Sequence, residues 1–457
     1  MRHAILPAML AATALAGCAP SLSEAPVEAG VAAPPQWRTQ LPGESAIEAR
    51  WWDGFGDPVL SDLVARARAN NPDAQIAAAR VEEARATERA SRGFLLPSLG
   101  AGAEGGARRE LDPFGRGVEA LAVQPTFQAS YELDLFGKNA ARVDAAEAGT
   151  AASVANEEAA RLAVSAATAS GYITLLALDA RLDVLRRTLA SRGEALKFAR
   201  DRAEVGYTSQ LELRQAEAEY AATAEQVPLV ETQIARQENA LSVLVGTLPG
   251  AIARGGDFAA LAMPPVPGTL PSEMLRRRPD IAAAEYRLAA ADAQIRVARA
   301  QFMPSINLGA SAGVVISDLL ADPVGIWSLG GSVLAPIFQG GRLQAQFDGA
   351  TARRDQAAWA YRSTALGAFR EVEDRLVKLE KLDERRRALE SQQAAIADAL
   401  RHARNRYRAG YTPYIEQVDA QRALLGAELA LVGVRADRLN TLVGLYQALG
   451  GAPRERD

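Results

Sequence analysis

Two long stretches, 138–205 and 340–409, contain no proline and few glycines. Both are rich in Ala, Leu, Arg, Glu and Gln, which favour helix strongly. At 1.5 Å per residue, each stretch predicts a helix roughly 100 Å long, and no compact globular domain needs a helix of that length. Apolar residues recur at threes and fours with alanine between them, so we expect a closely packed coiled-coil array. A purely structural helical bundle would show the same periodicity.

The sequence contains an internal duplication. Asn71-Pro72-Asp73 and Arg278-Pro279-Asp280 each open a helical stretch that ends, at the same spacing, in a Pro-Ser pair. The Gly-Tyr-Thr runs at 206–208 and 410–412 then interrupt both long helices. Self-similarity on this scale indicates that one structural plan is used twice. We predict a first repeat at 58–250, a linker at 251–271, a second repeat at 272–451 and a polar tail at 452–457.

Segments of alternating apolar and polar residues predict one β-hairpin in each repeat, at 98–136 and 305–338. In the first hairpin, Phe127, Ala129 and Tyr131 alternate with polar neighbours. The second hairpin repeats the pattern from Ser305, and a further apolar row consists of Trp327, Leu329, Val333 and Ile337. Such alternation is typical of membrane β-barrel strands, although a half-buried soluble sheet shows it too.

Four predicted strands are too few to close a membrane barrel, because the smallest such barrels need about eight. An open sheet edge cannot persist in lipid, since its backbone groups would lack hydrogen-bond partners. If these strands enter a membrane, several copies must share one barrel, and a cyclic oligomer is the simplest arrangement. The residues alone do not give the number of copies.

The N-terminus predicts export and a lipid anchor. A short positive start is followed by an apolar stretch too short to span a bilayer. Leu15-Ala16-Gly17-Cys18 looks like a bacterial lipobox, so we predict a signal peptide at 1–17, lipidation of Cys18 and a lipid-anchored segment at 18–57. Ordinary signal-peptide cleavage would instead leave a free thiol. Ala19 after the cysteine favours sorting to the outer membrane.

Composition argues against catalysis and against nucleic-acid binding. The formal charge is −4 at pH 7 and the pI is near 5.6, so the chain lacks the excess of basic residues that a nucleic-acid-binding protein needs. Cys18 is the only cysteine, and His402 is the only histidine left after processing. These counts exclude His or Cys metal clusters and any catalytic site that needs more than one imidazole. Carboxylate pairs lie on long helical faces, where a solvated surface is the simpler interpretation, so we expect neither an enzyme nor a cofactor.

The Gly-Tyr-Thr interruptions predict helix-turn-helix hairpins. Gly206 and Gly410 stand where a helix must end, because glycine tolerates the left-handed conformation that commonly ends one. Thr412 can cap the following helix, with Pro413 in its first position. Each long helix therefore turns back at a tip.

Carboxylates lie close to both predicted tips. Glu416 and Asp419 are three residues apart, so a helix places them on one face, one turn inside the hairpin. An exposed acidic turn near a helix N-terminus, where the helix dipole favours Asp and Glu, is the structural alternative. In the other tip, Ser209 and Glu212 fit the capping box S-x-x-E, which also gives Glu212 a purely structural explanation.

Several stretches resemble the TolC-like, OprM-like outer-membrane efflux lipoproteins, the outer-membrane factors of RND efflux systems. They are WWDGFGDPVLSDLVARA at 51–67, YELDLFGK at 131–138, LPSEMLRRRPDIAAAEYRLAAADAQIRVARAQFMPS at 270–305 and PIFQGGRL at 336–343. With both tips, the resemblance covers nearly all of the mature chain. It implies a mainly α fold with membrane β, in which a long α-helical coiled-coil barrel joins a twelve-stranded β-barrel shared by three protomers.

The resemblance implies an outer-membrane channel, the passive outlet duct of a tripartite efflux system for small molecules or drugs. The implied partners are two sister protomers, a periplasmic adaptor (membrane fusion protein), an inner-membrane RND-type transporter and outer-membrane lipid. The helical tunnel would project into the periplasm. The outlet of a type I protein secretion system and a non-conducting coiled-coil structural or adaptor lipoprotein are the alternatives.

The resemblance also implies roles for individual residues. Glu416 and Asp419, with Glu212 as a further candidate, match acidic residues that line the closed periplasmic gate. A ring of such carboxylates would attract cations and respond to pH and counter-ions. The family often has an arginine near this turn that locks the closed state, where this chain has Thr412 and Pro413. The implied contact surface for the adaptor consists of Val205, Gly206, Tyr207, Ala409, Gly410 and Tyr411.

Overall fold

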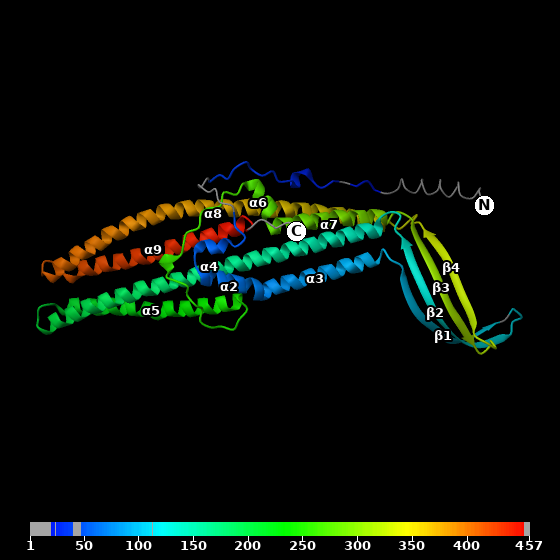
Figure 1. Ribbon diagram of the computed structural model, residues 1–457, viewed down its shortest axis with the longest axis horizontal. Helices are drawn as coiled ribbons and strands as arrows, with labels where there is room; N and C mark the ends of the chain where they lie inside the picture. Colours follow the sequence, from blue (N-terminus) through cyan, green and yellow to red (C-terminus); the bar gives the residue numbers. More distant parts are fainter. Residues whose placement is uncertain (1–19, 23, 40–46, 112, 452–457) are drawn as a thin grey trace. The chain divides into compact units, whose positions relative to one another are not determined.

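The computed structural model describes residues 20–22, 24–39, 47–111 and 113–451 (Figure 1). The signal peptide predicted at 1–17, the lipidation predicted at Cys18 and the polar tail at 452–457 lie outside the described residues. The chain divides into two compact units, and each unit draws on both halves of the sequence. The first comprises Met1–Val31, Arg80–Val154 and Ala283–Ser363, and the second comprises Ala32–Ala79, Ala155–Ala282 and Thr364–Asp457.

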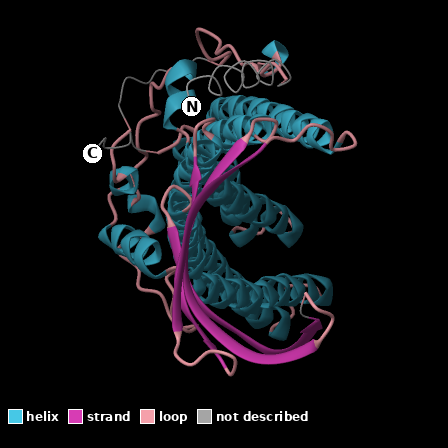
Figure 2. Ribbon diagram, turned by 90° about the vertical axis from the view of Figure 1, so that its right-hand side faces the viewer, coloured by secondary structure: helices cyan, strands magenta, loops and turns pink. Residues whose placement is uncertain are grey.

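A four-stranded antiparallel sheet belongs to the first unit. Its strands are β1 (Ser98–Leu111), β2 (Gly117–Leu133), β3 (Ser305–Ser317) and β4 (Val324–Leu334), in the order β1-β2-β3-β4. Figure 2 shows them as one curved sheet. Because β2 and β3 come from different halves of the sequence, their pairing joins the two hairpins into one sheet.

The strand register confirms the alternation of apolar and polar residues. One row across the four strands contains Ala101, Phe127, Ala312 and Trp327. The adjacent row contains Gly100, Gln128, Ser311 and Ser328, and the two serine hydroxyls are 2.8 Å apart. Since successive side chains point to opposite faces, one face of the sheet is apolar and the other is polar. β4 ends at Leu334, so Ile337 of the predicted apolar row lies beyond the strand.

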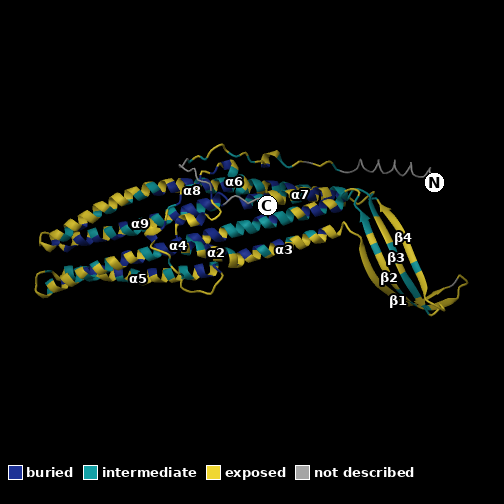
Figure 3. Cartoon of the chain, in the orientation of Figure 1, coloured by how far each residue is buried: buried dark blue, intermediate teal, exposed yellow. Residues whose placement is uncertain are grey.

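The apolar face of the sheet is exposed, and its outer strands pair on one side only. Trp327 and Leu329 of β4 are 80% and 78% exposed, and Figure 3 shows β1 and β4 exposed along most of their length. Among the described residues, β1 pairs only with β2, and β4 only with β3. An exposed apolar face with two open edges marks a surface that binds something else. The sheet is therefore incomplete in the single chain.

The helices of the first unit contact one another in chain order, as the strands of the sheet do. They are α3 (Pro72–Gly93), α4 (Lys138–Glu204), α7 (Pro279–Ala300) and α8 (Arg342–Arg408), and α3, α4 and α8 continue into the second unit. Arg92 of α3 pairs with Glu147 of α4 at 2.6 Å, and Arg296 of α7 pairs with Asp144 of α4 at 2.7 Å. α7 in turn packs on α8 through a cluster formed by Ile295, Ala298, Phe347 and Ala350.

The second unit is built from two long helical hairpins, α4–α5 and α8–α9. α4 and α8 each contain 67 residues, and α5 (Gln210–Leu244) and α9 (Tyr414–Ala448) each contain 35. Leu185 of α4, Val230 of α5 and Leu425 of α9 share one buried cluster. The predicted long helices are confirmed, and the fold is mainly helical with one sheet. The shorter elements are η1 (Val27–Ala29), η2 (Trp51–Phe55), α2 (Pro58–Asn70), η3 (Phe258–Ala260) and α6 (Pro271–Arg277).

Both hairpins end in the same way, which gives the repeated Pro-Asp stretches a structural role. The Asn71 side chain donates to the carbonyl of Leu244 at 3.0 Å, near the end of α5. Arg278 donates to the carbonyl of Ala448 at 2.9 Å, at the end of α9. Arg278 also pairs with Asp280 at 2.7 Å and with Glu371 of α8 at 2.9 Å. Each side chain thus satisfies a helix carbonyl that has no partner within its own helix.

A glycine beside each of these contacts makes a close approach that no other residue can make. Gly246 has φ +74°, and a Cβ there would lie 2.5 Å from the Asn70 carbonyl oxygen. Gly246→Ala is therefore expected to lower the free energy of unfolding by about 1 to 3 kcal/mol. The midpoint of thermal unfolding measures this loss. Gly193→Ala in α4 is the control, because its Cβ would make an ordinary 3.5 Å contact with Tyr220 and alanine favours helix. Equal midpoints for the two variants would contradict this explanation.

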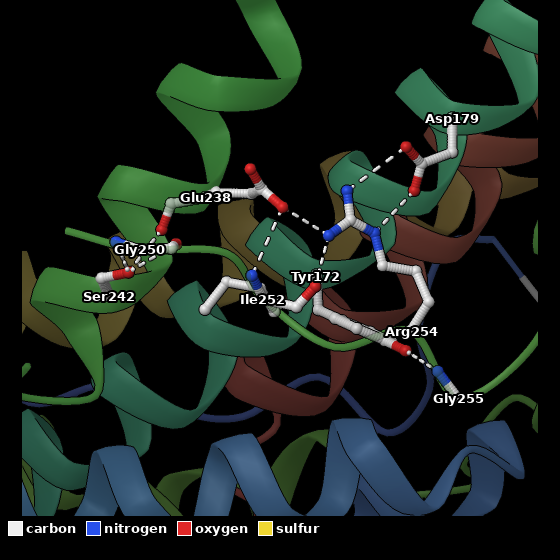
Figure 4. Close-up of polar contacts among 8 residues, drawn as sticks. All are labelled: Tyr172, Asp179, Glu238, Ser242, Gly250, Ile252, Arg254 and Gly255. Atoms are coloured by element: carbon white, nitrogen blue, oxygen red, sulfur yellow. Dashed lines mark hydrogen bonds and ion pairs between the residues drawn. The ribbon is translucent and has the colours of Figure 1, made fainter.

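A polar clamp holds the linker between the repeats against α4 and α5 (Figure 4). The Arg254 guanidinium pairs with Asp179 of α4 at 2.8 Å and with Glu238 of α5 at 2.5 Å. The Gly255 amide donates to the Tyr172 hydroxyl at 2.9 Å, and that hydroxyl donates to Asp57 at 2.9 Å. The clamp fixes the path of the linker by charge-assisted hydrogen bonds, which are stronger than neutral ones.

Candidate functional site at the hairpin tips

Both hairpins of the second unit turn through a left-handed glycine. Gly206 has φ +75° and Gly410 has φ +82°. The next residue reaches back along the helix in each tip: the Tyr207 amide donates to the Arg202 carbonyl at 2.8 Å, and the Tyr411 amide donates to the Arg406 carbonyl at 2.9 Å. The Gly206 amide also donates to the Ala203 carbonyl at 3.1 Å, and the Gly410 amide to the Tyr407 carbonyl at 3.0 Å, so each tip forms a Schellman motif. The predicted glycine stops are confirmed.

The predicted caps of the two following helices have different outcomes. Ser209 caps α5 as expected, because its hydroxyl accepts from the Glu212 amide at 3.3 Å. Thr412 does not cap α9: the N-cap position belongs to Pro413, which cannot form a side-chain cap, and α9 begins at Tyr414. The Thr412 hydroxyl oxygen is buried and has no hydrogen-bond partner among the described residues. We predicted that Thr412 would cap α9 and that Pro413 would be its first residue. This was wrong, because the Thr412 side chain is buried in the tip and the helix begins one residue later.

The outermost residues of both tips are exposed. Tyr207 and Tyr411 are 78% and 80% exposed, and Val205 is also largely exposed. Ala409 and the two glycines beside these residues are exposed as well. Each tip therefore presents an apolar end without a partner in the described part of the chain, and exposed apolar groups of this kind mark contact sites.

The three candidate gate carboxylates lie near the tips but have separate partners. Glu416 is 3.6 Å from Arg406 of α8, and Asp419 is 3.7 Å from Arg422 of α9. Glu212 of α5 accepts from the Thr208 hydroxyl, and the Tyr407 hydroxyl lies 3.5 Å from it. Among the described residues, no hydrogen bond or ion pair joins Glu212 to the other two carboxylates. Glu416 and Asp419 are exposed, so each side chain can face a further chain or solvent.

An ion network built on a buried Arg192–Glu219 pair connects both hairpins. Glu219 of α5 pairs with Arg192 of α4 at 3.0 Å, and its other carboxylate oxygen accepts from the Nε of Arg422 of α9 at 2.9 Å. Arg192 and Glu219 are only 3% and 7% exposed. Arg192 also donates to the Thr223 hydroxyl at 2.5 Å. The network thus links α4, α5 and α9, and through Arg422 it reaches the gate candidate Asp419.

Sequence reasoning missed this network, although the sequence contains a signal for it. Leu185, Arg192 and Ala199 are spaced by sevens along α4, and all three are buried. A charged residue on an otherwise apolar helical row needs a buried partner of opposite charge. The packing of α5 decides which carboxylate pairs with this arginine. The periodicity of the sequence does not predict that packing.

Tyr407 and Tyr414 belong to one buried cluster near the hairpin tips. The rings of Tyr407 and Tyr414 have centroids 5.2 Å apart, and the Arg202 guanidinium lies 5.6 Å from the Tyr407 ring. Burial, together with the neighbouring Tyr407 and Glu219, raises the pKa of Tyr414 to about 12. The phenol of Tyr414 is therefore neutral at physiological pH, and the fixed charges near the tips are those of the Arg, Asp and Glu side chains. In the described ranges, no group of three or more His, Cys, Asp or Glu side chains is placed to hold a metal ion.

Comparison with known proteins identifies the family. A family model described as outer membrane efflux protein matches residues 63–247 and 270–451. The chain is 35% identical to the pyoverdine export outer membrane protein OpmQ of Pseudomonas aeruginosa over 445 residues, 93% of each chain. It is 33% identical to the toluene efflux pump outer membrane protein TtgC of Pseudomonas putida, covering 99% of this chain and 96% of the relative.

A solved structure agrees with the sequence relatives. The open-state structure of the MtrE outer membrane channel of Neisseria gonorrhoeae matches this chain with a TM-score of 0.83 at 32% identity, covering 95% of this chain and 98% of that one. The long paired helices, the four-stranded sheet with an apolar face and the family match all point to one class of protein. The chain belongs to the outer membrane efflux protein family and is an outer-membrane efflux channel.

Proposed function

We propose that three copies of this chain form the outlet duct of a tripartite efflux system, with one twelve-stranded β-barrel in the outer membrane and a helical tunnel in the periplasm. The observation that carries this proposal is the incomplete sheet: four strands, two open edges and an exposed apolar face. A membrane barrel must close, so the open edges of β1 and β4 require strands from sister copies. Resemblance to the family favours three copies over two.

The two repeats at 58–250 and 272–451 contribute equivalent elements to this arrangement. Each contributes one β-hairpin to the barrel and one long helical hairpin to the tunnel. The linker at 251–271 joins the repeats, and its clamp on α4 and α5 supports a fixed connection between them. Because the two repeats supply similar but not identical hairpins, three chains give six hairpin tips around the periplasmic end.

A lipid on Cys18 would add a second attachment to the outer membrane through the segment at 18–57. Described parts of this segment bind to the rest of the chain. Arg362 of α8 donates to the carbonyls of Glu28 and Gly30 at 2.7 and 2.6 Å. Farther along, the Trp37 indole donates to the Thr269 carbonyl at 2.7 Å. These contacts favour an arm that stays bound to the protein between the lipid and the first helices.

The tip carboxylates would form the periplasmic gate. Three copies of Glu416 and Asp419 give a ring of six acidic side chains, with Glu212 on the neighbouring hairpin. Such a ring attracts cations and makes the constriction sensitive to counter-ions. The pairs of Glu416 with Arg406 and of Asp419 with Arg422 are exposed and weak, as surface pairs usually are. We therefore assign the firm contact between the hairpins to the Arg192–Glu219–Arg422 network, whose Arg192–Glu219 pair is buried, in place of the arginine latch that the family often has at the turn.

The exposed tips would contact a periplasmic adaptor, which connects the duct to an inner-membrane RND-type transporter. The transporter would supply the energy, so the duct needs neither a catalytic site nor a cofactor. The relatives are named for export of pyoverdine and toluene, and we propose small organic molecules as the exported class. A wide duct selects little among them, so the transporter would set the specificity.

Substitution of the tip glycines tests the adaptor contact. Gly206→Trp and Gly410→Trp are expected to abolish export while the oligomer still assembles. In the ranges that the structure describes, no atom lies within 4 Å of a Cβ at either position, and the left-handed conformation costs only about 1–2 kcal/mol for a residue with a side chain. Export of a dye from cells gives the readout, and Gly206→Asn is the control, since asparagine tolerates this conformation. Loss of assembly in the Trp variants would assign both glycines to folding alone.

Conductance tests the duct itself. Purified full-length protein, added to a planar lipid bilayer, is expected to give stepwise ion currents. Neutralising the gate ring with Glu416→Gln and Asp419→Asn is expected to change the current while the number of copies stays the same. A coiled-coil spacer without a pore would give no current at any protein concentration, and that result would reject the proposed function.

A further inference from the structure

The polar face of the sheet carries mostly small, uncharged side chains. Gly100 and Gly102 of β1 and the hydrogen-bonded serines Ser311 and Ser328 are representative. On this face, between the pair Ala122–Ser317 and the helical end of the strands, the described carboxylates are Glu104 and Glu132. Among these uncharged neighbours, a carboxylate supplies the negative charge of this part of the face.

The two carboxylates on the polar face differ in their partners. Glu132 lies at the end of β2 and pairs with Lys138 at 2.5 Å, so its charge is balanced. Glu104 lies in the middle of β1, is exposed and stands opposite the neutral Gln124. In the described part of the chain, Glu104 makes no ion pair. It is therefore the one uncompensated charge on this part of the face.

Other charges near Glu104 do not cancel it. Arg108 is the next basic residue on the same face, about 13 Å farther along β1 at 3.3 Å per residue. Glu110 follows Arg108 on that face, so the formal charges of these two side chains sum to zero. Arg109 and Glu119 lie on the opposite face, where they pair with each other at 3.5 Å. β4 is the strand whose open edge would meet β1 of a sister copy, and its described residues include no charged side chain.

We infer that Glu104 is the unpaired fixed charge of the lumen between the pair Ala122–Ser317 and the helical end of the strands, and that it gives the duct a preference for cations, including cationic organic substrates. The inference rests on the proposed function, because only a closed barrel turns the polar face into a lumen wall. Three copies place three unpaired carboxylates at one level of the barrel. A ring of acidic side chains raises the local concentration of cations and lowers that of anions. This site is separate from the acidic ring at the tips.

The reversal potential across a planar bilayer measures this preference. A salt gradient with 0.01 M KCl on one side is suitable, because the Debye length there is about 30 Å and screening inside a wide lumen is weak. All variants are made in the background Glu416→Gln and Asp419→Asn, so that the tip carboxylates do not dominate. In this background, Glu104→Gln is expected to lower the cation-to-anion permeability ratio about twofold at that Debye length.

Two matched variants make the test specific. Gln124→Glu adds a second carboxylate on the same face, directly opposite Glu104, and is expected to raise the ratio above that of the parent. Glu119→Gln removes a carboxylate from the opposite face and is expected to leave the ratio unchanged. Conducting channels whose ratio does not respond to Glu104→Gln and Gln124→Glu would overturn this inference while leaving the duct intact. A parent protein without any current would instead overturn the proposed function, and this inference with it.

Discussion

Phe127→Arg is expected to prevent assembly of the oligomer in the outer membrane, whereas Gln128→Arg on the neighbouring position is expected to be tolerated. Phe127 lies on the apolar face of β2 and is largely exposed in the single chain. Gln128 points to the polar face. An arginine on the lipid face of a membrane barrel costs about 2–4 kcal/mol near the bilayer midplane. Each of three copies would bear that cost, while an arginine in the lumen stays in water.

The yield of oligomer extracted from outer membranes measures this difference. The two variants carry the same charge one residue apart on one strand, so expression level and net charge are matched. Equal yields would show that the apolar face of the sheet does not meet lipid. A lower yield for Gln128→Arg than for Phe127→Arg would reverse the proposed orientation of the sheet.

Glu219→Ala is expected to loosen the hairpin tips and to raise the conductance of the assembled duct. The substitution leaves the guanidinium of Arg192 buried without a carboxylate, and removing one member of a buried ion pair costs about 3–5 kcal/mol. It also releases Arg422 of α9 from α5. Since Glu219 bonds both α4 and α9, its loss separates the two hairpins that we propose to be held together in the closed state.

Glu217→Ala on the same helix is the matched control. Glu217 is half-buried and pairs with two exposed arginines, Arg214 at 2.6 Å and Arg200 of α4 at 4.0 Å, and such surface pairs contribute about 0–1 kcal/mol. Single-channel conductance and the midpoint of thermal unfolding are the two readouts. If both variants matched the parent in conductance and stability, the buried network would have no part in holding the tips.

The long helices and the strand pattern could be predicted because they depend on local periodicity. Proline-free runs of strong helix formers leave little alternative to α4 and α8. The alternation around Phe127 gives the same face assignment that the register gives, since side-chain direction in a strand follows from position alone. Gly206 and Gly410 were predictable for a similar reason, because a left-handed helix end is a local property of glycine.

Features that depend on packing between distant segments could not be predicted. The Arg192–Glu219 pair joins two helices whose relative rotation the sequence does not specify. The role of Arg278 in capping α9 became clear only when its 2.9 Å contact with Ala448 was seen. The predicted Thr412 cap failed because burial of the Thr412 side chain competes with capping, and local sequence rules do not include that competition.

We propose above all that sister copies close one β-barrel in the membrane. The protein mass of the detergent-solubilised particle is the most direct test of this proposal. Light scattering that separates protein from detergent gives this mass for the purified full-length protein. A particle with three times the mass of one chain is expected. A particle with the mass of a single chain, stable in water without detergent, would contradict the proposal.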